Sequence, residues 1–453
     1  MNKKSTWLTT LAVVAGLCAA GSAYATNGYY THGTGTKNKA MAGSGIALPE
    51  DAIDVANNPA VAPFVGDQLV FGAALFSPVR KYETSDSLAN GFGGAFTIGP
   101  NRLTSDKDYF VIPHISRSWQ LENDAAWALS FYGRGGMNTT WKGGTATFDG
   151  NRDGVPEVYD GTYGAGTAGV DLNQAFLDVT WAKIVNPKLS LGISAVLVAQ
   201  WFEAKGVGNF APYTETFSAS GGTVFPDSLS NNGHDWSFGA GVKVGLHAPV
   251  SDKVSLGLMY QSKIWMGEFD DYSDLFAKQG DFDIPANLKA GITFHANENL
   301  DLNFDYEYIW FSDVAAVGNP IQDLFNCPPF GGDFSNCLGG DNGGGFGWEN
   351  MSIFKVGARY KAGEDWTWRF GYSYGDQPIP SDQMTFNILA PAVMESHFTA
   401  GFTLERVQGR QFNMSVMYAP NSKQRGMNNF DPTQEVMFEM YQWEVEASYS
   451  WRF

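Results

Sequence analysis

A strict two-residue alternation ends the chain and constrains its fold more than any other feature. In YQWEVEASYSWRF, residues 441–453, apolar or aromatic residues alternate with polar or small ones. This period of two predicts a long β-strand with one polar and one apolar face. A soluble sheet would turn its apolar face toward a core, whereas a membrane barrel turns that face toward lipid and its polar face toward the lumen.

The same alternation recurs along the chain from residue 68 onward. We count fourteen such stretches, an even number of the kind that bacterial outer-membrane barrels have. The predicted strands are 68–79, 109–121, 124–137, 171–184, 189–204, 234–249, 254–267, 284–295, 300–312, 350–361, 365–377, 393–405, 410–420 and 437–453.

The connections between these stretches are alternately short and long. The short ones are rich in turn-forming residues and lie at 185–188, 250–253, 296–299, 362–365 and 407–410. The long ones are 80–108, 141–170, 205–233, 268–283, 313–349, 378–392 and 421–436. Short turns on one side and long loops on the other predict an all-β fold, a transmembrane 14-stranded antiparallel β-barrel over residues 68–453. A soluble secreted β-protein is the alternative.

Residues 26–67 are rich in glycine and alanine and show no strand alternation. A barrel of fourteen strands is wider than its own side chains can fill. We therefore expect this segment to form a compact plug, or hatch, inside the lumen. The alternative is a disordered periplasmic tail.

The first 25 residues indicate the compartment. Lys3 and Lys4 precede an apolar run that is too short to span a bilayer, and Ala23-Tyr24-Ala25 is a small-x-small cleavage site. These features predict a signal peptide over residues 1–25 and export. With the barrel pattern they predict the outer membrane of a Gram-negative cell. The chain has 29 basic and 47 acidic residues, a balance that argues against nucleic acid as a partner.

Four stretches together resemble the FadL/TodX family of outer-membrane transporters for hydrophobic compounds. GTGTKNKAMAGSGIALPEDAIDVANNPA resembles the family's hatch, which ends in the motif Asn58, Pro59 and Ala60. FDDYSDLFAKQGDFDIPANLKAGI resembles an extracellular loop with the strand that follows it. FKVGARYKAGEDWTWRFGYSYGDQPIPSDQMTFNILAP resembles a strand pair before a Pro-x-Pro loop, and the last strand resembles an outer-membrane assembly signal.

The resemblance implies passive transport of hydrophobic compounds, with long-chain fatty acids first and neutral aromatic or aliphatic hydrocarbons as the alternative. Ligand would be caught at the outer loops, passed to a pocket beside the hatch, and released sideways at a kinked third strand. The implied partners are the hydrophobic ligand, outer-membrane lipid and lipopolysaccharide, and the outer-membrane assembly machinery. No enzymatic activity is implied.

Three glycines interrupt the third predicted strand, at Gly133, Gly135 and Gly136. Glycines inside a strand mark bulges and kinks, and a kink breaks the hydrogen-bond ladder to the neighbouring strand. We therefore expect a lateral opening here. The alternative is a loop that begins at Gly133.

A fatty acid needs an apolar contact surface and a cation for its carboxylate. Leu275 and Phe276 are candidates for a landing site in the loops, although loop packing explains them equally well. The basic candidates that alternation or the kink places toward the lumen are Arg134, Lys289, Lys355, Arg359 and Arg369. Ion pairs with lumen acids are the alternative role for each of these cations.

Two further motifs lie in the predicted long loops. Cys327 and Cys337 form a close pair in a Gly/Pro-rich loop, which predicts a local disulfide in an exported protein. DGNRDGVPEVYDG follows the spacing of a calcium-binding loop. No cofactor is expected apart from a structural calcium ion there, with the candidate ligands Asp149, Asn151, Asp153, Glu157 and Asp160.

Other functions have weaker support in the sequence. GYSYG, residues 371–375, matches the serine-hydrolase pattern around Ser373, but it lies within a predicted strand instead of a strand-turn-helix elbow. A structural or adhesive barrel would not need the plug. A polar porin would conduct ions steadily, which a plugged barrel should not do.

Overall fold

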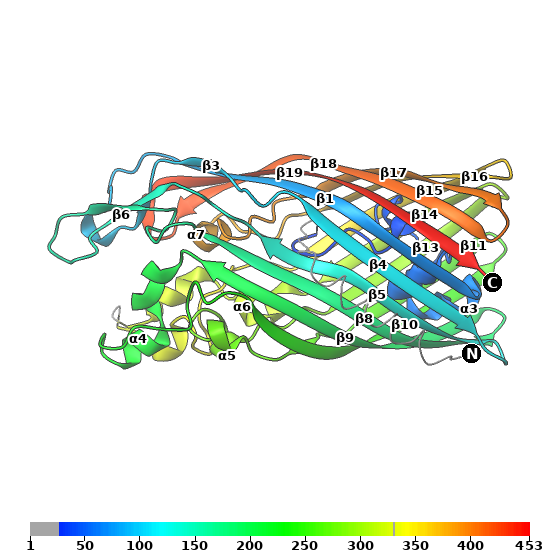
Figure 1. The fold of residues 1–453 in the computed structure, drawn as a ribbon, viewed down its shortest axis with the longest axis horizontal. Helices are drawn as coiled ribbons and strands as arrows, with labels where there is room; N and C mark the ends of the chain where they lie inside the picture. Colours follow the sequence, from blue (N-terminus) through cyan, green and yellow to red (C-terminus); the bar gives the residue numbers. More distant parts are fainter. Residues whose placement is uncertain (1–26, 329–330) are drawn as a thin grey trace, which may run out of the picture.

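The structure is a computed structural model that describes residues 27–328 and 331–453, so the predicted signal peptide lies outside the described residues. Fourteen long antiparallel strands form the wall of a barrel (Figure 1). These strands are β1 (Gln68–Thr84), β4 (Phe110–Gln120), β5 (Ala125–Asn138), β8 (Gly169–Asn186), β9 (Leu189–Lys205), β10 (Asp235–Ser251), β11 (Val254–Gln261), β13 (Asn287–Asn297), β14 (Leu300–Ile309), β15 (Met351–Ala362), β16 (Trp366–Gly375), β17 (Ser396–Val407), β18 (Arg410–Asn428) and β19 (Asp431–Arg452).

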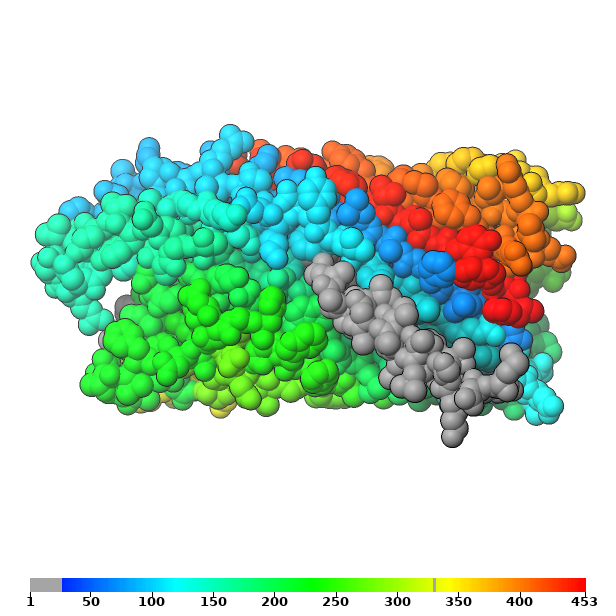
Figure 2. Space-filling model, viewed as in Figure 1, coloured from blue at the N-terminus to red at the C-terminus, as the bar shows by residue number. Residues whose placement is uncertain are grey.

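Each strand of the wall pairs with its neighbours in sequence order, and β19 pairs with β1 to close the ring. The register runs from Gln68 opposite Arg452 to Thr84 opposite Val436. In the space-filling view the red last strand lies directly beside the blue first strand (Figure 2). The closed 14-stranded barrel is therefore the fold that the alternation predicts.

The remaining strands and helices are short and belong to the loops or to the amino-terminal segment. Strands β2 (Thr97–Ile98), β6 (Thr145–Phe148) and β7 (Glu157–Asp160) form a separate small sheet, whereas β3 (Arg102–Thr104) pairs with β1 and β12 (Trp265–Met266) pairs with β10. The loop helices are η3 (Phe92–Gly94), η4 (Gly208–Tyr213), α4 (Glu215–Ala219), η5 (Asp270–Tyr272), α5 (Ala277–Gly280), η6 (Phe311–Asp313), α6 (Ala315–Gly318), η7 (Ile321–Asn326), η8 (Phe334–Asn336) and α7 (Met384–Asn387). Within the described ranges, none of the helices has the length and hydropathy to cross a bilayer.

Side chains alternate across the wall as a membrane barrel requires. On β15, Phe354 is 60% exposed, whereas its neighbour Lys355 is 2% exposed. On the paired strand β14, Phe304 is exposed and Asp305 is buried. The apolar face is thus the outer face and the polar face is the lumen face, as the sequence predicts.

One predicted loop is wrong. Residues 421–436 are expected to be a long loop, but β18 and β19 extend through them and meet in a tight hairpin. The ladder is interrupted between Ala419 and Ser422, where Pro420 cannot donate a hydrogen bond. Beyond the membrane both faces of a hairpin can be polar, so the sequence here shows no apolar alternation.

Residues 27–67, which we call the amino-terminal segment, are mostly buried and lie within the barrel, largely toward the end that carries the carboxyl terminus (Figure 1). The segment contains α2 (Thr36–Lys39), η1 (Ala52–Ala56), η2 (Pro59–Val61) and α3 (Ala62–Val65). Asp51 and Asp54 form a capping box at η1, and the Asn58 side chain caps η2, where Pro59 occupies the first turn. The caps and the glycines therefore favour short turns over a strand.

Candidate functional site

An apolar cavity lies between the long loops and the loop ends of the wall strands β8 and β9. Every residue that lines it is apolar or glycine: Val170, Phe202, Val207, Phe210, Leu275, Phe276, Ala316, Leu338, Gly344, Gly345, Phe346, Phe386 and Leu389. Its volume is about 30 Å³, so the side chains that line it nearly fill it. The two loop candidates from the sequence, Leu275 and Phe276, thus lie in one cavity. We call it the outer cavity.

A second, smaller cavity lies deeper, between the loops and the amino-terminal segment. It is lined by Gly28, Tyr29, Arg80, Met137, Asn138, Ala390, Pro391 and Ala392. The two cavities are lined by consecutive residues, because Leu389 lines the outer one and Ala390, Pro391 and Ala392 line the deeper one. We call the deeper space the inner cavity, and it borders the upper part of β5.

The seam between β4 and β5 is incomplete beside the inner cavity. The last pair in their register is His114 with Tyr132. Above it, β5 carries a bulge between Gly133 and Gly135, while its other edge remains paired with β8. The segment before β4 and the segment after β5 meet again where Asp106 N donates to Thr140 O. Between these points, no backbone pair joins β4 to β5 in the described part of the chain.

Glycine and proline explain why the ladder stops here. A Cβ added to Gly135 would lie 2.0 Å from Gln174 Oε1, so a larger residue here would displace the Gln174 side chain. On the facing strand, Pro113 has no N–H to donate, and proline within a sheet is confined to strand edges and bulges. Pro113 is a signal that the sequence analysis missed.

Three basic side chains gather around one carboxylate below the inner cavity. Lys355 Nζ lies 2.7 Å from Glu307 Oε2, Lys289 Nζ lies 3.4 Å from Glu307 Oε1, and Arg134 Nη2 lies 3.7 Å from the same oxygen. All four groups are buried. Arg134 also lies over the ring of Tyr30, at 4.5 Å from its centroid. We call these four residues the cation cluster.

The other two basic candidates belong to a different group. Arg369 and Arg359 bind Glu50 of the amino-terminal segment at 2.6 and 3.2 Å, and Arg359 also pairs with Asp301. Burial alone would raise the pKa of Glu50, but the two guanidinium groups hold it well below its usual range. Arg359 and Arg369 therefore anchor the segment to the wall, and their contact with ligand stays a prediction.

Further buried contacts fix the rest of the segment. Lys39 Nζ lies 3.0 Å from Glu444 and 2.7 Å from Glu446, both on β19. At the predicted hatch motif, Asn58 Nδ2 donates to Ile46 O and Leu246 O, and Asn58 Oδ1 accepts from Ala60 N.

Two glycines of the wall allow this close contact. A Cβ on Gly192 would lie 2.4 Å from the Pro59 carbonyl carbon, and a Cβ on Gly245 would lie 2.1 Å from Asn58 Oδ1. The Asn-Pro-Ala motif is thus pressed against β9 and β10.

The predicted calcium ligands lie on the β6–β7 hairpin. Asp149 accepts from the backbone N–H groups of Asp153 and Gly154, and Asn151 Nδ2 donates to Asp153 and Glu157. Asp160 lies at the far end of the hairpin opposite Thr145, so the structure does not bring it to the other four. Calcium binding stays a prediction.

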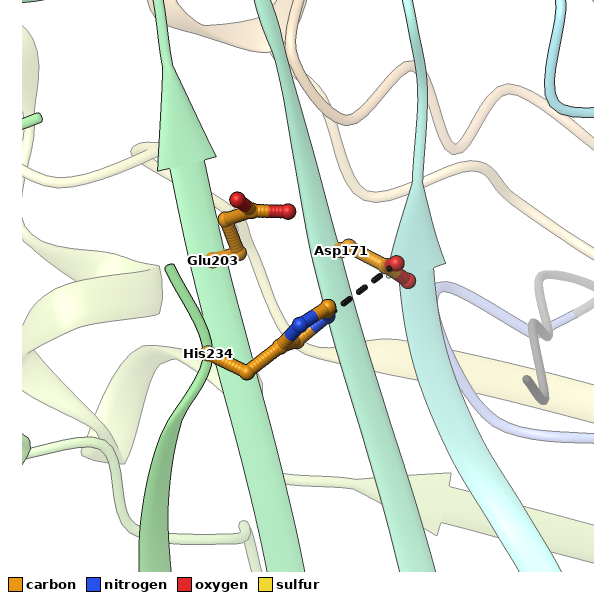
Figure 3. Close-up of side chains that lie close together, drawn as sticks. All are labelled: Asp171, Glu203 and His234. Carbon is orange, nitrogen blue, oxygen red and sulfur yellow. Dashed lines mark hydrogen bonds and ion pairs between the residues drawn. The ribbon is translucent and has the colours of Figure 1, made fainter. Parts of the chain in front are cut away.

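A different cluster of possible metal ligands occurs at the loop end of the wall. Within the described ranges, Asp171, Glu203 and His234 are one group whose ligand atoms lie within 4.8 Å of one another (Figure 3). Lys107 lies 3.3 Å from Asp171 and Lys205 lies 2.9 Å from Glu203. A surface charge network explains this cluster without a metal.

Two remaining motifs are readily placed. Cys327 and Cys337 form a disulfide in the loop between β14 and β15. Ser373 is buried on the lumen face of β16, where its Oγ lies 3.2 Å from His397 Nδ1. The GYSYG stretch lies entirely within β16, so the elbow that a serine hydrolase needs is not formed at this motif.

Comparisons with known proteins agree with this geometry. The family model of the outer membrane protein transport proteins (OMPP1/FadL/TodX) matches residues 11–449. The solved structure of the toluene transporter TodX of P. putida is similar at 17% identity with a TM-score of 0.61, covering 93% of this chain and 99% of that chain. A FadL homologue of Pseudomonas aeruginosa is similar at 16% identity with a TM-score of 0.65, covering 94% and 100%.

The toluene transporter TbuX of Ralstonia pickettii is similar at 17% identity with a TM-score of 0.58, covering 93% of this chain and 99% of that chain. At these identities the likeness shows the fold alone. No protein with a curated description matches the chain. Because the family model spans nearly the whole chain, the protein belongs to the OMPP1/FadL/TodX family of outer-membrane transport proteins, which are channels for hydrophobic compounds and not enzymes.

Proposed function

We propose that the protein carries long-chain fatty acids passively through the outer membrane and releases them sideways. The observation that carries this proposal is the order of the parts: the apolar outer cavity and the inner cavity are lined by consecutive residues at 389–392, and the inner cavity borders β5, whose seam with β4 is incomplete. Ligand would enter among the loops, pass residues 389–392, and leave between the two strands.

Apolar burial supplies the driving force without a nucleotide. Each buried CH₂ gains about 0.8 kcal/mol on leaving water, so a chain of about sixteen carbons gains roughly 12 kcal/mol. The polar surface of the outer leaflet is the barrier that such a path avoids. Contacts of the wall with lipopolysaccharide, and of the terminal strand with the assembly machinery, stay predictions.

The amino-terminal segment acts in this proposal as the plug that closes the straight route. Its buried ion pairs with β15, β16 and β19 fill the lower lumen with fixed charge. A hydrophobic molecule would have to break these pairs to pass straight through, and breaking one buried pair costs about 3–5 kcal/mol. The sideways route crosses the apolar outer cavity and then the inner cavity, where Arg80 and Asn138 are the polar side chains of the lining.

The cation cluster supports an acid as the preferred ligand. Lys289, Lys355 and Arg134 share the single carboxylate of Glu307, so the group holds more positive than negative charge. Its Arg134 lies over the ring of Tyr30, the residue that follows Tyr29 of the inner cavity. A fatty acid whose tail fills the path would place its carboxylate where buried charge is unbalanced.

A neutral aromatic hydrocarbon is the second candidate. Two of the similar structures are toluene transporters. The outer cavity is also lined by the rings of Phe202, Phe210, Phe276, Phe346 and Phe386, which suit an aromatic ligand.

Binding measurements separate the two candidates. We expect the purified protein to bind palmitate at least ~10-fold more tightly than hexadecane or toluene, a difference of about 1.4 kcal/mol. Lys289→Met should remove that preference, and Lys183→Met, an exposed lysine on β8, should leave it unchanged. Equal binding of palmitate and the neutral compounds, or no effect of Lys289→Met, would contradict the fatty-acid assignment.

A further inference from the structure

A cleft opens between two of the long loops, at the end of the molecule opposite the carboxyl terminus (Figure 1). The β6–β7 hairpin forms one side and the loop of η4 and α4 forms the other, and Figure 2 shows the notch between the turquoise hairpin and the green loop. The cleft has a volume of about 800 Å³. Ligand sites have volumes of about 300–1,000 Å³. Its aromatic lining consists of Phe148, Tyr159, Phe217 and Phe225, which line neither the outer nor the inner cavity.

Strand β7 is the last strand of the small sheet, and in the described part of the chain no strand pairs with its outer edge. The hydrogen bond from Gly161 N to Gly144 O sets the phase of the β6–β7 ladder. Because hydrogen-bonded pairs alternate along an antiparallel ladder, Val158 points its N–H and C=O away from β6. Asp160 points the same way, and its C=O accepts from Gly166 N. Among the described residues, neither backbone group of Val158 has a hydrogen-bond partner, and its side chain is 67% exposed.

The hairpin that carries this edge is acidic. Residues 145–160 hold one basic residue, Arg152, and four acidic ones: Asp149, Asp153, Glu157 and Asp160. Charged side chains beside an exposed strand keep like edges from pairing, and a group of carboxylates attracts a basic partner. The same carboxylates repel the acid group of a fatty acid. The cleft therefore suits a different ligand from the one proposed for transport.

Exposed apolar side chains around the cleft define the ligand further. Phe225 is 68% exposed, although large apolar side chains gathered at the surface usually mark an interaction site. A second hollow of about 550 Å³ shares Phe148 and Arg152 with the cleft and is also lined by the exposed Phe92. A ligand that covers both hollows has to be elongated and partly apolar.

We propose that β7 and this cleft form a docking site for an extended, basic and partly apolar polypeptide segment from outside the cell, which adds a strand to β7. Strand addition takes its affinity from main-chain hydrogen bonds and its specificity from side chains. Strand β7 has four residues, Glu157–Asp160. At about 3.3 Å per residue it offers about 13 Å of edge. This binding function is independent of the transport path.

Synthetic peptides added to the purified protein test the site. The probe is a peptide of alternating lysine and valine, and binding is measured in EDTA so that calcium cannot occupy the same carboxylates. One control carries N-methyl groups on alternate residues, which removes backbone donors and keeps the charge. The other control has glutamate in place of lysine. We expect both controls to bind at least ~10-fold more weakly than the probe.

Equal binding of the N-methylated peptide would overturn strand addition, and equal binding of the glutamate peptide would overturn the charge argument. A probe that does not bind would overturn the whole proposal. Palmitate uptake is measured separately, so a failure of the peptide site leaves the transport proposal standing.

A substitution on β7 tests the edge itself. Val158→Pro removes the outward N–H but leaves the pairs with β6 in place, because proline is tolerated on a strand edge whose N–H faces solvent. Val158→Ala keeps the donor and is the matched control. We expect Val158→Pro to weaken binding of the probe at least ~10-fold relative to Val158→Ala, with palmitate uptake unchanged in both. Equal binding by the two variants would contradict pairing at this edge.

A pair of charge substitutions tests the acidic hairpin. We expect Asp153→Asn/Asp160→Asn to weaken binding of the probe at least ~5-fold and to reduce its dependence on salt. Asp270→Asn/Asp271→Asn removes two exposed carboxylates from another loop and should leave binding unchanged. An equal loss in both double variants would assign binding to the overall negative charge of the chain and overturn the site.

Discussion

The lower half of the lumen is filled by charged side chains in ion pairs, whereas the upper half is filled by apolar side chains. The lower half holds buried ion pairs between the amino-terminal segment and the wall, such as Lys39 with Glu446 and Glu50 with Arg369. The upper half holds an apolar cavity lined by loop side chains. Buried charges are costly to separate, whereas apolar contacts can be exchanged for those of a ligand at little cost. The contrast explains why ligand should enter the upper half and leave at the boundary.

Breaking the lower half should have the largest effect. Glu50→Gln leaves the guanidinium groups of Arg359 and Arg369 without their shared carboxylate, and removing one partner of a buried pair costs about 3–5 kcal/mol. We expect a looser segment and steady ion conductance in a planar bilayer, where wild type shows little. Glu435→Gln, which removes an exposed partner of Arg425, is the control and should change neither property. Wild-type conductance in Glu50→Gln would contradict the division of the lumen.

A charge placed in the upper half should have the next largest effect. Leu389→Asp puts an unpaired carboxylate between the two cavities, where burial of a charge is strongly unfavourable. We expect palmitate uptake to fall at least ~10-fold, equivalent to about 1.4 kcal/mol. Leu389→Met keeps an apolar side chain of similar volume and should transport normally. Normal uptake by the aspartate variant would mean that ligand does not pass here.

Extending the pairing of β4 with β5 should have a moderate effect on palmitate uptake. Pro113→Val gives β4 a backbone donor beside the incomplete seam, and one added hydrogen bond is worth about 1 kcal/mol. We expect uptake to fall about 5-fold as pairing between β4 and β5 extends upward. Hydrogen exchange of the amides at residues 110–112 should slow in the same variant. Faster uptake with slower exchange would contradict release through this seam.

The smallest effect should come from pH. Burial, with the carboxylates of Asp51 and Glu50 nearby, raises the pKa of Asp54 to about 7. The docked segment therefore binds this proton more tightly than the released segment does, and docking weakens as pH rises from about 4 through 7. We expect a spin label on η1 to be less mobile at pH 5 than at pH 8. Asp54→Asn should reduce the difference, and a pH dependence that is unchanged in this variant would assign it to another group.

The two-residue alternation predicted the part of the fold that lies in the membrane. The strands of the wall and the inward direction of Lys355 follow from it, because lipid and lumen impose opposite side chains on neighbouring positions. Above the membrane both faces meet water, and the hairpin at residues 421–436 was therefore missed. The partner of Arg369 was hidden as well, because Glu50 is distant in sequence and only the folded segment brings it close. The gap in the seam at Pro113 could have been predicted from the sequence, because proline within a sheet is confined to strand edges and bulges.

The most direct test of sideways release is the position of the ligand during transport. A fatty acid with a photoreactive group at its tail would be added to cells and crosslinked, and the adducts mapped by mass spectrometry. The account predicts adducts on both sides of the seam, at Phe110, Ile112 and Met137. Adducts on the lower lumen wall, at Asn303, Glu446 and Ser448, with the seam residues unlabelled, would contradict it.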